Sequence, residues 1–148
     1  MRAARREIRA LQAIERACYP PSVLEEADPL GDLVADGARY RVLRHGTAPV
    51  GYIMVMDPED GGPGVYVADL AILPGHRRHP SVWRQAIGWL GKALEGQPRV
   101  EAHCRAASRG MLIRFLQRMG YSVTATDLHD FFPGEVVAHV VGRREGGA

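Results

Sequence analysis

Cysteine is scarce in this sequence, and its scarcity excludes two kinds of scaffold. Cys18 and Cys104 are the only cysteines among 148 residues, and they lie far apart. No Cys-x-x-Cys motif and no Cys–His pair at zinc spacing is present, so the sequence predicts neither a disulfide framework nor a metal site. Two free thiols suit a reducing compartment, and we therefore expect a cytoplasmic protein.

Long hydrophobic runs are also absent. No apolar segment approaches the roughly 20 residues that a membrane-spanning helix needs. The N-terminal stretch MRAARREIRAL is rich in arginine, but the apolar region of a signal peptide does not follow it. Glu7 and Glu15 argue against a transit peptide, and we expect no membrane partner.

A strong excess of one charge is missing as well. The formal net charge is only +2, whereas a protein that tracks nucleic-acid phosphates needs a concentrated basic face. Nucleic acid is therefore not the expected partner. A weaker alternative, an accessory protein on nucleic acid, depends on the basic N-terminal residues Arg2, Arg5, Arg6 and Arg9.

What is present is the composition of an ordinary globular protein. Hydrophobic residues make up 46% of the chain and charged residues 24%, which excludes a disordered or collagen-like chain. A chain of 148 residues can bury one sizeable core. We therefore expect residues 1–148 to form a single domain.

Hydrophobic patterning predicts helices and strands in a definite order. Apolar residues at helical spacing predict a helix over 4–18, and capping signals predict a second short helix that ends at Asp36. Alternation around a His-Gly-Thr turn predicts a hairpin, and the following VYVADLAILP is apolar on both faces, as a central strand is. The pattern then predicts a helix over 82–95, a strand at RVEAHCR, a helix over 108–119, and two strands joined at Pro133-Gly134.

This order predicts an α/β (α+β) fold with a mixed, mostly antiparallel central sheet flanked by helices. The segment from Val65 to Leu73 is expected to be its central strand. The final hairpin has alternating apolar residues, and an exposed edge there would favour a homodimer. Those residues are Val136, Val137, Val140 and Val141.

The segment LPGHRRHPSVW, residues 73–83, joins the central strand to the next helix and is rich in basic residues. The free N–H groups and the dipole of a helix N-terminus favour an anion, so this junction is a general phosphate site. Neither of the two common nucleotide-binding glycine motifs, G-x-x-x-x-G-K-[ST] and G-x-G-x-x-G, is present. Pattern alone therefore predicts an anion site without naming its ligand.

Three segments, together with the element order, resemble one known family. They are DLAILPGHRR, SRGMLIRFLQRMGY and DFFPGEVVAHVV. The resemblance is to the GNAT superfamily of acyl-CoA-dependent N-acetyltransferases, and it covers nearly the whole chain. It implies the GNAT fold, acetyl-CoA (CoA) as the cofactor, and direct transfer of an acetyl group to a primary amine of a small molecule or a protein.

The same resemblance implies where the cofactor binds. In the family the central strand ends in D-L-x-V-x-P-x-x-R, and a Q/R-x-x-G-x-G/A loop then wraps the pyrophosphate; here Pro80 and Val82 stand at the small positions of that loop. A simple helix start beside surface arginines is the alternative. The implied cofactor-binding residues are Ala71, Ile72, Leu73, Arg77, Arg78, His79, Ser81, Val82, Trp83, Ser108 and Arg109.

Catalytic residues also follow from the resemblance. Some members carry a glutamate base on the fifth strand, and His103 falls nearest to that position, with Glu101 as the same-face alternative. A histidine titrates near neutral pH, as a proton carrier should. Asp69 lies on the central strand where an incoming amine is expected. A structural histidine and a loop-bonding carboxylate are the alternatives for His103 and Asp69.

Two further features concern the leaving group and the acceptor. The family's tyrosine acid corresponds here to Leu116, so a binding or regulatory GNAT module without catalysis is the alternative function. Tyr19, Glu25 and Glu26 lie in a stretch that often lines the substrate side, and they could receive a cationic amine. A solvated acidic face is the alternative for that stretch.

Overall fold

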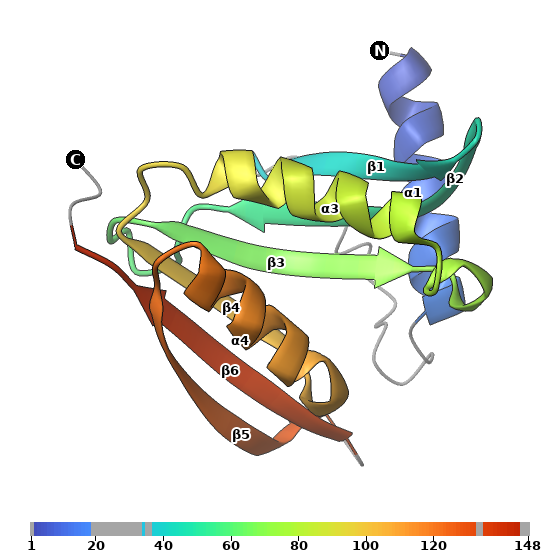
Figure 1. Ribbon diagram of the computed structural model, residues 1–148. Coiled ribbons are helices and arrows are strands. Elements are labelled where there is room, and N and C mark those ends of the chain that lie inside the picture. Colours follow the sequence, from blue (N-terminus) through green and yellow to red (C-terminus); the bar gives the residue numbers. More distant parts are fainter. Residues whose placement is uncertain (1, 19–33, 35–36, 133–134, 146–148) are drawn as a thin grey trace. The chain divides into compact units, whose positions relative to one another are not determined.

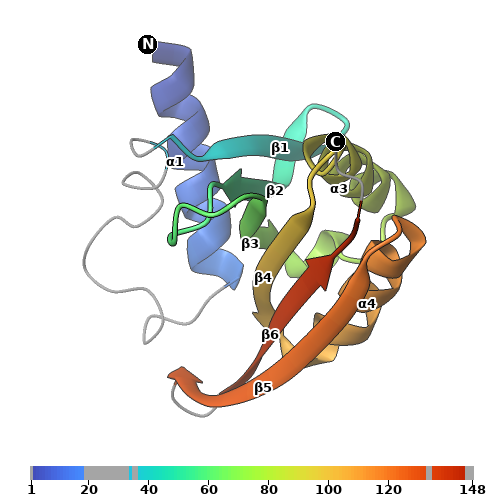
Figure 2. The same ribbon diagram turned by 90° about the vertical axis from the view of Figure 1, so that its left-hand side faces the viewer.

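The computed structural model describes residues 2–18, 34, 37–132 and 135–145. The second short helix predicted up to Asp36 and the turn at Pro133-Gly134 lie outside the described residues. Figures 1 and 2 show the other elements. They are α1 (Arg2–Cys18), β1 (Arg39–His45), β2 (Ala48–Met56), β3 (Val65–Ile72), the 3-10 helix η1 (Pro74–His76), α3 (Pro80–Ala93), β4 (Arg99–Arg105), the 3-10 helix η2 (Ala106–Ser108), α4 (Arg109–Arg118), β5 (Ser122–Phe132) and β6 (Glu135–Arg143).

The strands form one six-stranded sheet in the order β1-β2-β3-β4-β6-β5. Pairing is antiparallel between β1 and β2, β4 and β6, and β5 and β6, and parallel between β3 and β4. The predicted fold class, a mixed and mostly antiparallel sheet with helices, is therefore confirmed. The prediction that the strand beginning at Val65 lies inside the sheet is also confirmed, because β3 lies between β2 and β4.

The chain divides into two compact units. The first contains residues 1–55 and 69–90, and the second contains residues 56–68 and 91–148, so β3 and α3 each contribute to both. We describe each unit by itself. That residues 1–148 fold as a single domain stays a prediction.

In the first unit, α1 and α3 cover opposite faces of the sheet (Figures 1 and 2). Leu11 and Ile14 are the buried residues of α1, as the helical spacing predicts. In α3 the buried residues are Val82, Ala86 and Leu90, whereas Ile87, which the sequence placed on the apolar face, is 46% exposed. The prediction of the apolar face is therefore correct at Ala86 and Leu90 and wrong at Ile87.

Strands β2 and β3 approach each other unusually closely in the first unit. A Cβ atom at Gly51 would lie 2.6 Å from the carbonyl oxygen of Ala71, which leaves room for glycine alone. The N–H of Leu73 donates to the carbonyl of Val50 at 2.8 Å, just past the end of β3. These contacts fix the strand end from which the predicted phosphate site begins.

In the second unit, α4 packs on β5 and β6, and Leu116 is its buried residue. Met111, predicted to be part of the buried stripe, is 42% exposed. The hydroxyl of Tyr121 donates to the carbonyls of Leu94 and Gln97, so this ring closes the core at the C-terminal end of α4.

The structure corrects the argument for a homodimer. Strand β6 lies between β4 and β5 and is paired on both sides, so it is no exposed edge. Val137 and Val140, which were expected to seek a partner chain, are 3% and 0% exposed. The apolar alternation of β6 therefore reflects burial, and the edge strands are β1 and β5.

Candidate active site

The corner, which we define as residues 73–83, belongs to the first unit and contains η1, a short turn and the start of α3. Helix α3 begins at Pro80, as the sequence predicts for a proline at the first helical position. The N–H groups of Val82 and Trp83 donate to the carbonyl of His79. In the described part of the chain, the N–H groups of Arg78 and Ser81 make no backbone hydrogen bond. The helix start therefore keeps one open donor, at Ser81, and the turn before it keeps another, at Arg78.

Two arginines of the corner have different surroundings, although both are exposed. The Nε of Arg77 donates to the carbonyl of Ile72 at 2.9 Å, and the carbonyl of Arg77 accepts a hydrogen bond from the indole of Trp83 at 2.5 Å. Arg78 makes no side-chain interaction with any described residue. Arg77 therefore stabilises the corner itself, whereas the guanidinium of Arg78 is available to a ligand.

The end of β3 offers fewer donors than the family resemblance implies. Ala71 and Ile72 are buried, and the N–H of Leu73 is already bonded to Val50. The family resemblance implies that a backbone N–H around Ala71 to Leu73 meets the thioester carbonyl, and of these the N–H of Leu73 is already bonded inside the sheet.

Val82, likewise predicted to bind the cofactor, has a fully buried side chain, and its N–H donates to His79. The side chain of Val82 is therefore packed in the core and its N–H is hydrogen-bonded within the protein. Although Val82 stands at a small position of the family's loop, its side chain therefore does not crowd the outside of the corner.

Asp69 lies on β3 and is held by a neighbouring strand of the first unit. The hydroxyl of Tyr52 donates a hydrogen bond to its carboxylate, and Tyr52 is 0% exposed. A carboxylate fixed by a buried donor has a defined orientation, which suits a group that positions a substrate amine. Tyr52 was not among the predicted site residues, because alternation within its strand does not specify which side chain of a neighbouring strand lies beside it.

His103, in the second unit, belongs to a group of polar side chains on one face of the sheet. Its Nδ1 lies 2.8 Å from the hydroxyl of Tyr66, and its ring stacks on the ring of His139 with centroids 4.6 Å apart. His139 stands directly opposite His103 in the register, and Tyr66 directly opposite Glu101. Side chains opposite each other share a face. We call Tyr66, Glu101, His103 and His139 the His103 face.

The pKa values on this face follow from burial and charge. Burial lowers the pKa of His103, the positive charge of His139 lowers it further, and the carboxylates of Glu101 and Glu59 oppose the shift without reversing it. For Glu101, burial raises the pKa, but the hydrogen bond from His139 and the charge of Arg99 outweigh burial and leave it lowered. At pH 7 His103 is therefore neutral and Glu101 ionised.

Glu101 is already paired with two basic side chains. Its carboxylate lies 2.9 Å from the guanidinium of Arg99 and 2.8 Å from the Nε2 of His139. A carboxylate with these partners is a poor proton acceptor. Between the two candidates on β4, the neutral His103 is therefore the better base.

The other predicted residues of the second unit have mainly structural contacts. Arg109 forms an ion pair with Asp127, and Ser108 occupies the N-cap of α4 without a side-chain capping bond. Burial raises the pKa of Cys104, so this thiol stays protonated and inert at pH 7. Leu116, at the position of the family's tyrosine, is 1% exposed and packs in the core.

The structure therefore gathers the predicted residues in two places, each within one unit. Asp69 and the corner belong to the first, and His103, Ser108 and Arg109 belong to the second. Tyr19, Glu25 and Glu26, predicted to bind the acceptor amine, lie outside the described residues.

The comparisons with known proteins identify the family of this chain. The acetyltransferase (GNAT) family model matches residues 8–121, which include the corner and His103, and the chain belongs to this family. No curated protein matches the sequence. None of the helices that the structure describes is long and apolar enough to cross a membrane.

Solved structures show the fold independently. Diaminobutyrate acetyltransferase EctA from Paenibacillus lautus, in complex with diaminobutyric acid and coenzyme A, has a TM-score of 0.66 and 20% identity over 93% of this chain and 90% of its own. The ribosomal-protein-S18-alanine N-acetyltransferase of Escherichia coli has a TM-score of 0.63 and 13% identity, covering 95% and 90%. The yncA protein of Salmonella typhimurium, with its cofactor acetyl-CoA, has a TM-score of 0.60 and 18% identity, covering 99% and 90%.

Proposed function

We propose that this protein is an acyl-CoA-dependent N-acetyltransferase that transfers acetyl directly from acetyl-CoA to a primary amine. The observation that carries the proposal is the match of residues 8–121 to the acetyltransferase (GNAT) family, because this range contains both the basic corner and the His103 face up to β4. Neighbours with coenzyme A or acetyl-CoA bound support the choice of cofactor.

The corner fits the diphosphate of such a cofactor. Arg78 is exposed, and the open N–H of Ser81 is a donor at a helix N-terminus, where an anion is favoured. The open N–H of Arg78 lies in the turn just before that helix. Pro80 has no N–H, so the corner provides one donor fewer than a loop with glycine at that position. Arg77 and Trp83 act as positioning residues for the corner. Arg77 does so by its hydrogen bond to the carbonyl of Ile72, and Trp83 by its hydrogen bond to the carbonyl of Arg77.

His103 is the proposed general base. Bound acetyl-CoA supplies an activated carbonyl, and the chain must remove a proton from the attacking amine. When His103 donates its Nδ1–H to the oxygen of Tyr66, its Nε2 lone pair can accept that proton. Tyr66 then selects the reactive tautomer of His103. Asp69, oriented by Tyr52, is proposed to hold the ammonium group before its deprotonation.

One observation favours a second function, that of a CoA-binding module without catalysis. Leu116 occupies the core where the family resemblance places a tyrosine acid, so no hydroxyl of that residue can protonate the departing thiolate. In the first proposal, water takes this role. The two functions predict the same cofactor binding and differ in turnover.

The amine acceptor is proposed to be recognised as a cation. The N-terminal part of the sequence supplies one aromatic and two acidic side chains that attract a cation, namely Tyr19, Glu25 and Glu26. Replacing both glutamates by glutamine should raise KM for a cationic acceptor and leave the affinity for acetyl-CoA unchanged. An unchanged KM would remove these residues from the acceptor site.

An acceptor panel tests the function. Purified protein is incubated with acetyl-CoA and small diamines, amino acids, polyamines or peptides with a free N-terminus, and the released thiol is measured. We expect at least one acceptor to give turnover that His103→Gln abolishes. Cofactor binding without turnover on any acceptor would favour the binding module.

A further inference from the structure

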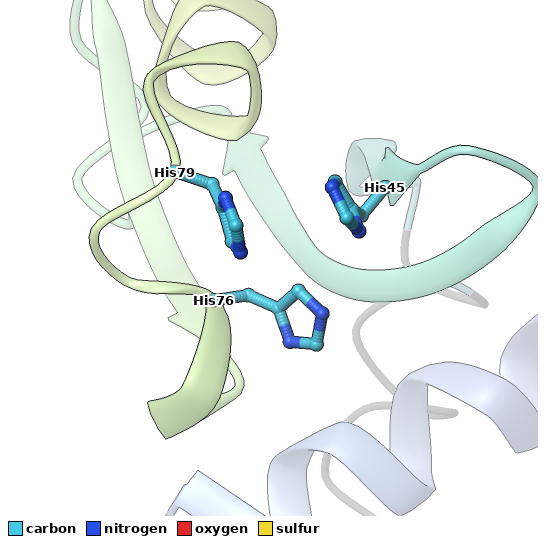
Figure 3. A group of neighbouring side chains, drawn as sticks. All are labelled: His45, His76 and His79. Atoms are coloured by element: carbon cyan, nitrogen blue, oxygen red, sulfur yellow. The ribbon is translucent and has the colours of Figure 1, made fainter.

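Three histidines from two separate parts of the sequence meet beside the corner. His45 is the last residue of β1, His76 is the last residue of η1, and His79 immediately precedes α3. Their possible ligand nitrogens all lie within 4.8 Å of one another. Figure 3 shows the three rings turned toward one common space, with His45 facing the two histidines of the corner.

The rings form a compact group. His45 and His79 stack with centroids 4.5 Å apart at an interplanar angle of 21°. The ring of His76 lies 5.4 Å from each of them and is tilted by 57° and 39°. One nitrogen of each ring therefore lies close to the other two. A cation binds in the plane of each imidazole, so the stacked rings of His45 and His79 turn about their side-chain bonds when they coordinate it.

Hydrogen bonds hold the backbone on both sides of the group. The N–H and carbonyl of Arg44, next to His45, bond to the side-chain amide of Gln85 on α3 at 2.9 and 2.7 Å. The N–H of His76 donates to Leu73 at 2.8 Å, and that of His79 donates to His76 at 3.2 Å. The three side chains therefore start from fixed positions within one unit of the protein.

One ring nitrogen has no partner. The Nδ1 of His76 is inaccessible to solvent and makes no hydrogen bond in the described part of the chain. Buried polar atoms in native proteins almost always have a partner, so this exception needs an explanation. Coordination of a cation through this nitrogen would satisfy it.

We propose that His45, His76 and His79 bind a zinc-type transition-metal cation, with the fourth tetrahedral position left to solvent. An all-imidazole set selects Zn²⁺, Ni²⁺ or Cu²⁺ and excludes Mg²⁺ and Ca²⁺, which require oxygen ligands. Zinc–nitrogen bonds of about 2.0–2.1 Å place tetrahedral ligands about 3.3 Å apart, so the rings close by at most about 1.5 Å on binding.

The bound cation would connect the end of β1 to the corner. Spacing along the sequence did not predict this site. His45 comes from the hairpin and forms no sequence motif with His76 and His79. Binding of the cation depends only on these three side chains and is measured without acetyl transfer, although His79 is also one of the residues that the family resemblance implies for the cofactor.

Metal titration of a tag-free, chelator-treated protein tests the site. Zn²⁺ is titrated in competition with a chromophoric chelator, thermal unfolding is followed with and without Zn²⁺, and the visible spectrum is recorded with Co²⁺. We expect one Zn²⁺ per chain, a higher melting temperature with Zn²⁺, and a tetrahedral Co²⁺ spectrum without thiolate charge transfer.

His45→Ala is the decisive variant, because His45 is exposed and its removal leaves the core intact. It should weaken Zn²⁺ binding at least tenfold and abolish the thermal shift, as should His76→Ala and His79→Ala. His129→Ala, at an exposed histidine of β5, is the matched control and should bind like the wild type. Zn²⁺ affinity unchanged by His45→Ala, or no binding by the wild type, would overturn the proposal.

Discussion

The corner gathers its candidate groups from one short stretch of chain, whereas the His103 face gathers its groups from three strands. In the corner, Arg77, Arg78 and Ser81 are sequence neighbours, and the N–H groups of a helix start add to them. On the His103 face, Tyr66 comes from β3 and His139 from β6. We propose that the corner holds an anion by charge and open donors, and that the face sets the protonation state of one imidazole.

The difference implies that the two regions serve separable steps. Changes in the corner should alter cofactor affinity, and changes on the His103 face should alter turnover. The following predictions test that separation.

The largest effect is expected for His103→Ala. General-base catalysis contributes about 10²- to 10⁴-fold to a rate, so turnover should fall by that factor while affinity for acetyl-CoA stays nearly unchanged. Thiol release measures the first and calorimetry the second. His129→Ala is the matched control, and a parallel loss of affinity in His103→Ala would contradict the separation.

Arg78→Ala is expected to weaken acetyl-CoA binding by about tenfold to a hundredfold. Hydrogen bonds to charged groups contribute about 1.5–3 kcal/mol, and Arg78 has no partner among the described side chains to compensate. Arg77→Ala should weaken it at least as much, because the bond that Arg77 makes to Ile72 is lost as well. Arg84→Ala, at an exposed arginine of α3, controls for net charge; an equal loss there would contradict a specific contact.

Pro80→Gly should act in the opposite direction and tighten acetyl-CoA binding several-fold. The glycine restores one N–H donor at the helix start, at a cost in helix stability of about 1 kcal/mol or less. Fluorescence titration against the wild type checks the sign. Weaker binding would indicate that the cofactor avoids this part of the corner.

The smallest effect concerns pH. Because the pKa of His103 lies below its ordinary value, kcat/KM should stay constant at neutral pH and fall only below pH 6.5. His139→Gln removes a positive charge that lowers this pKa, so the acid limb should move to higher pH. A profile of kcat/KM against pH for the wild type and His139→Gln measures this shift. An identical acid limb in both proteins would show that His103 is not the group that titrates in it.

Stability should depend on pH in the same direction. The folded state binds fewer protons than the unfolded state when a pKa is lowered on folding. The stabilisation associated with His103 is therefore present above pH 6.5 and is lost as the pH falls, and that of Glu101 is lost below pH 4.5.

The local regions of this protein were predictable and the distributed ones were not. Periodicity predicted the extent of β4, and it predicted α3 over 82–95, two residues later than the observed Pro80–Ala93, because both elements depend on neighbouring residues. The pairing of His103 with His139 depends on the register of β4 and β6, which no local pattern specifies. For the same reason, local patterns predicted β6 wrongly as an exposed edge and did not predict that His45 lies beside the corner.

Calorimetric titration with acetyl-CoA at low and high salt tests most directly that the corner holds the cofactor. For the wild type we expect one site per chain whose affinity falls as salt rises, because exposed guanidinium contacts are screened. For Arg78→Ala we expect weaker binding with a smaller dependence on salt. Binding that is equally tight in both proteins and at both salt concentrations would contradict the account, and the corner would then be only the start of a helix.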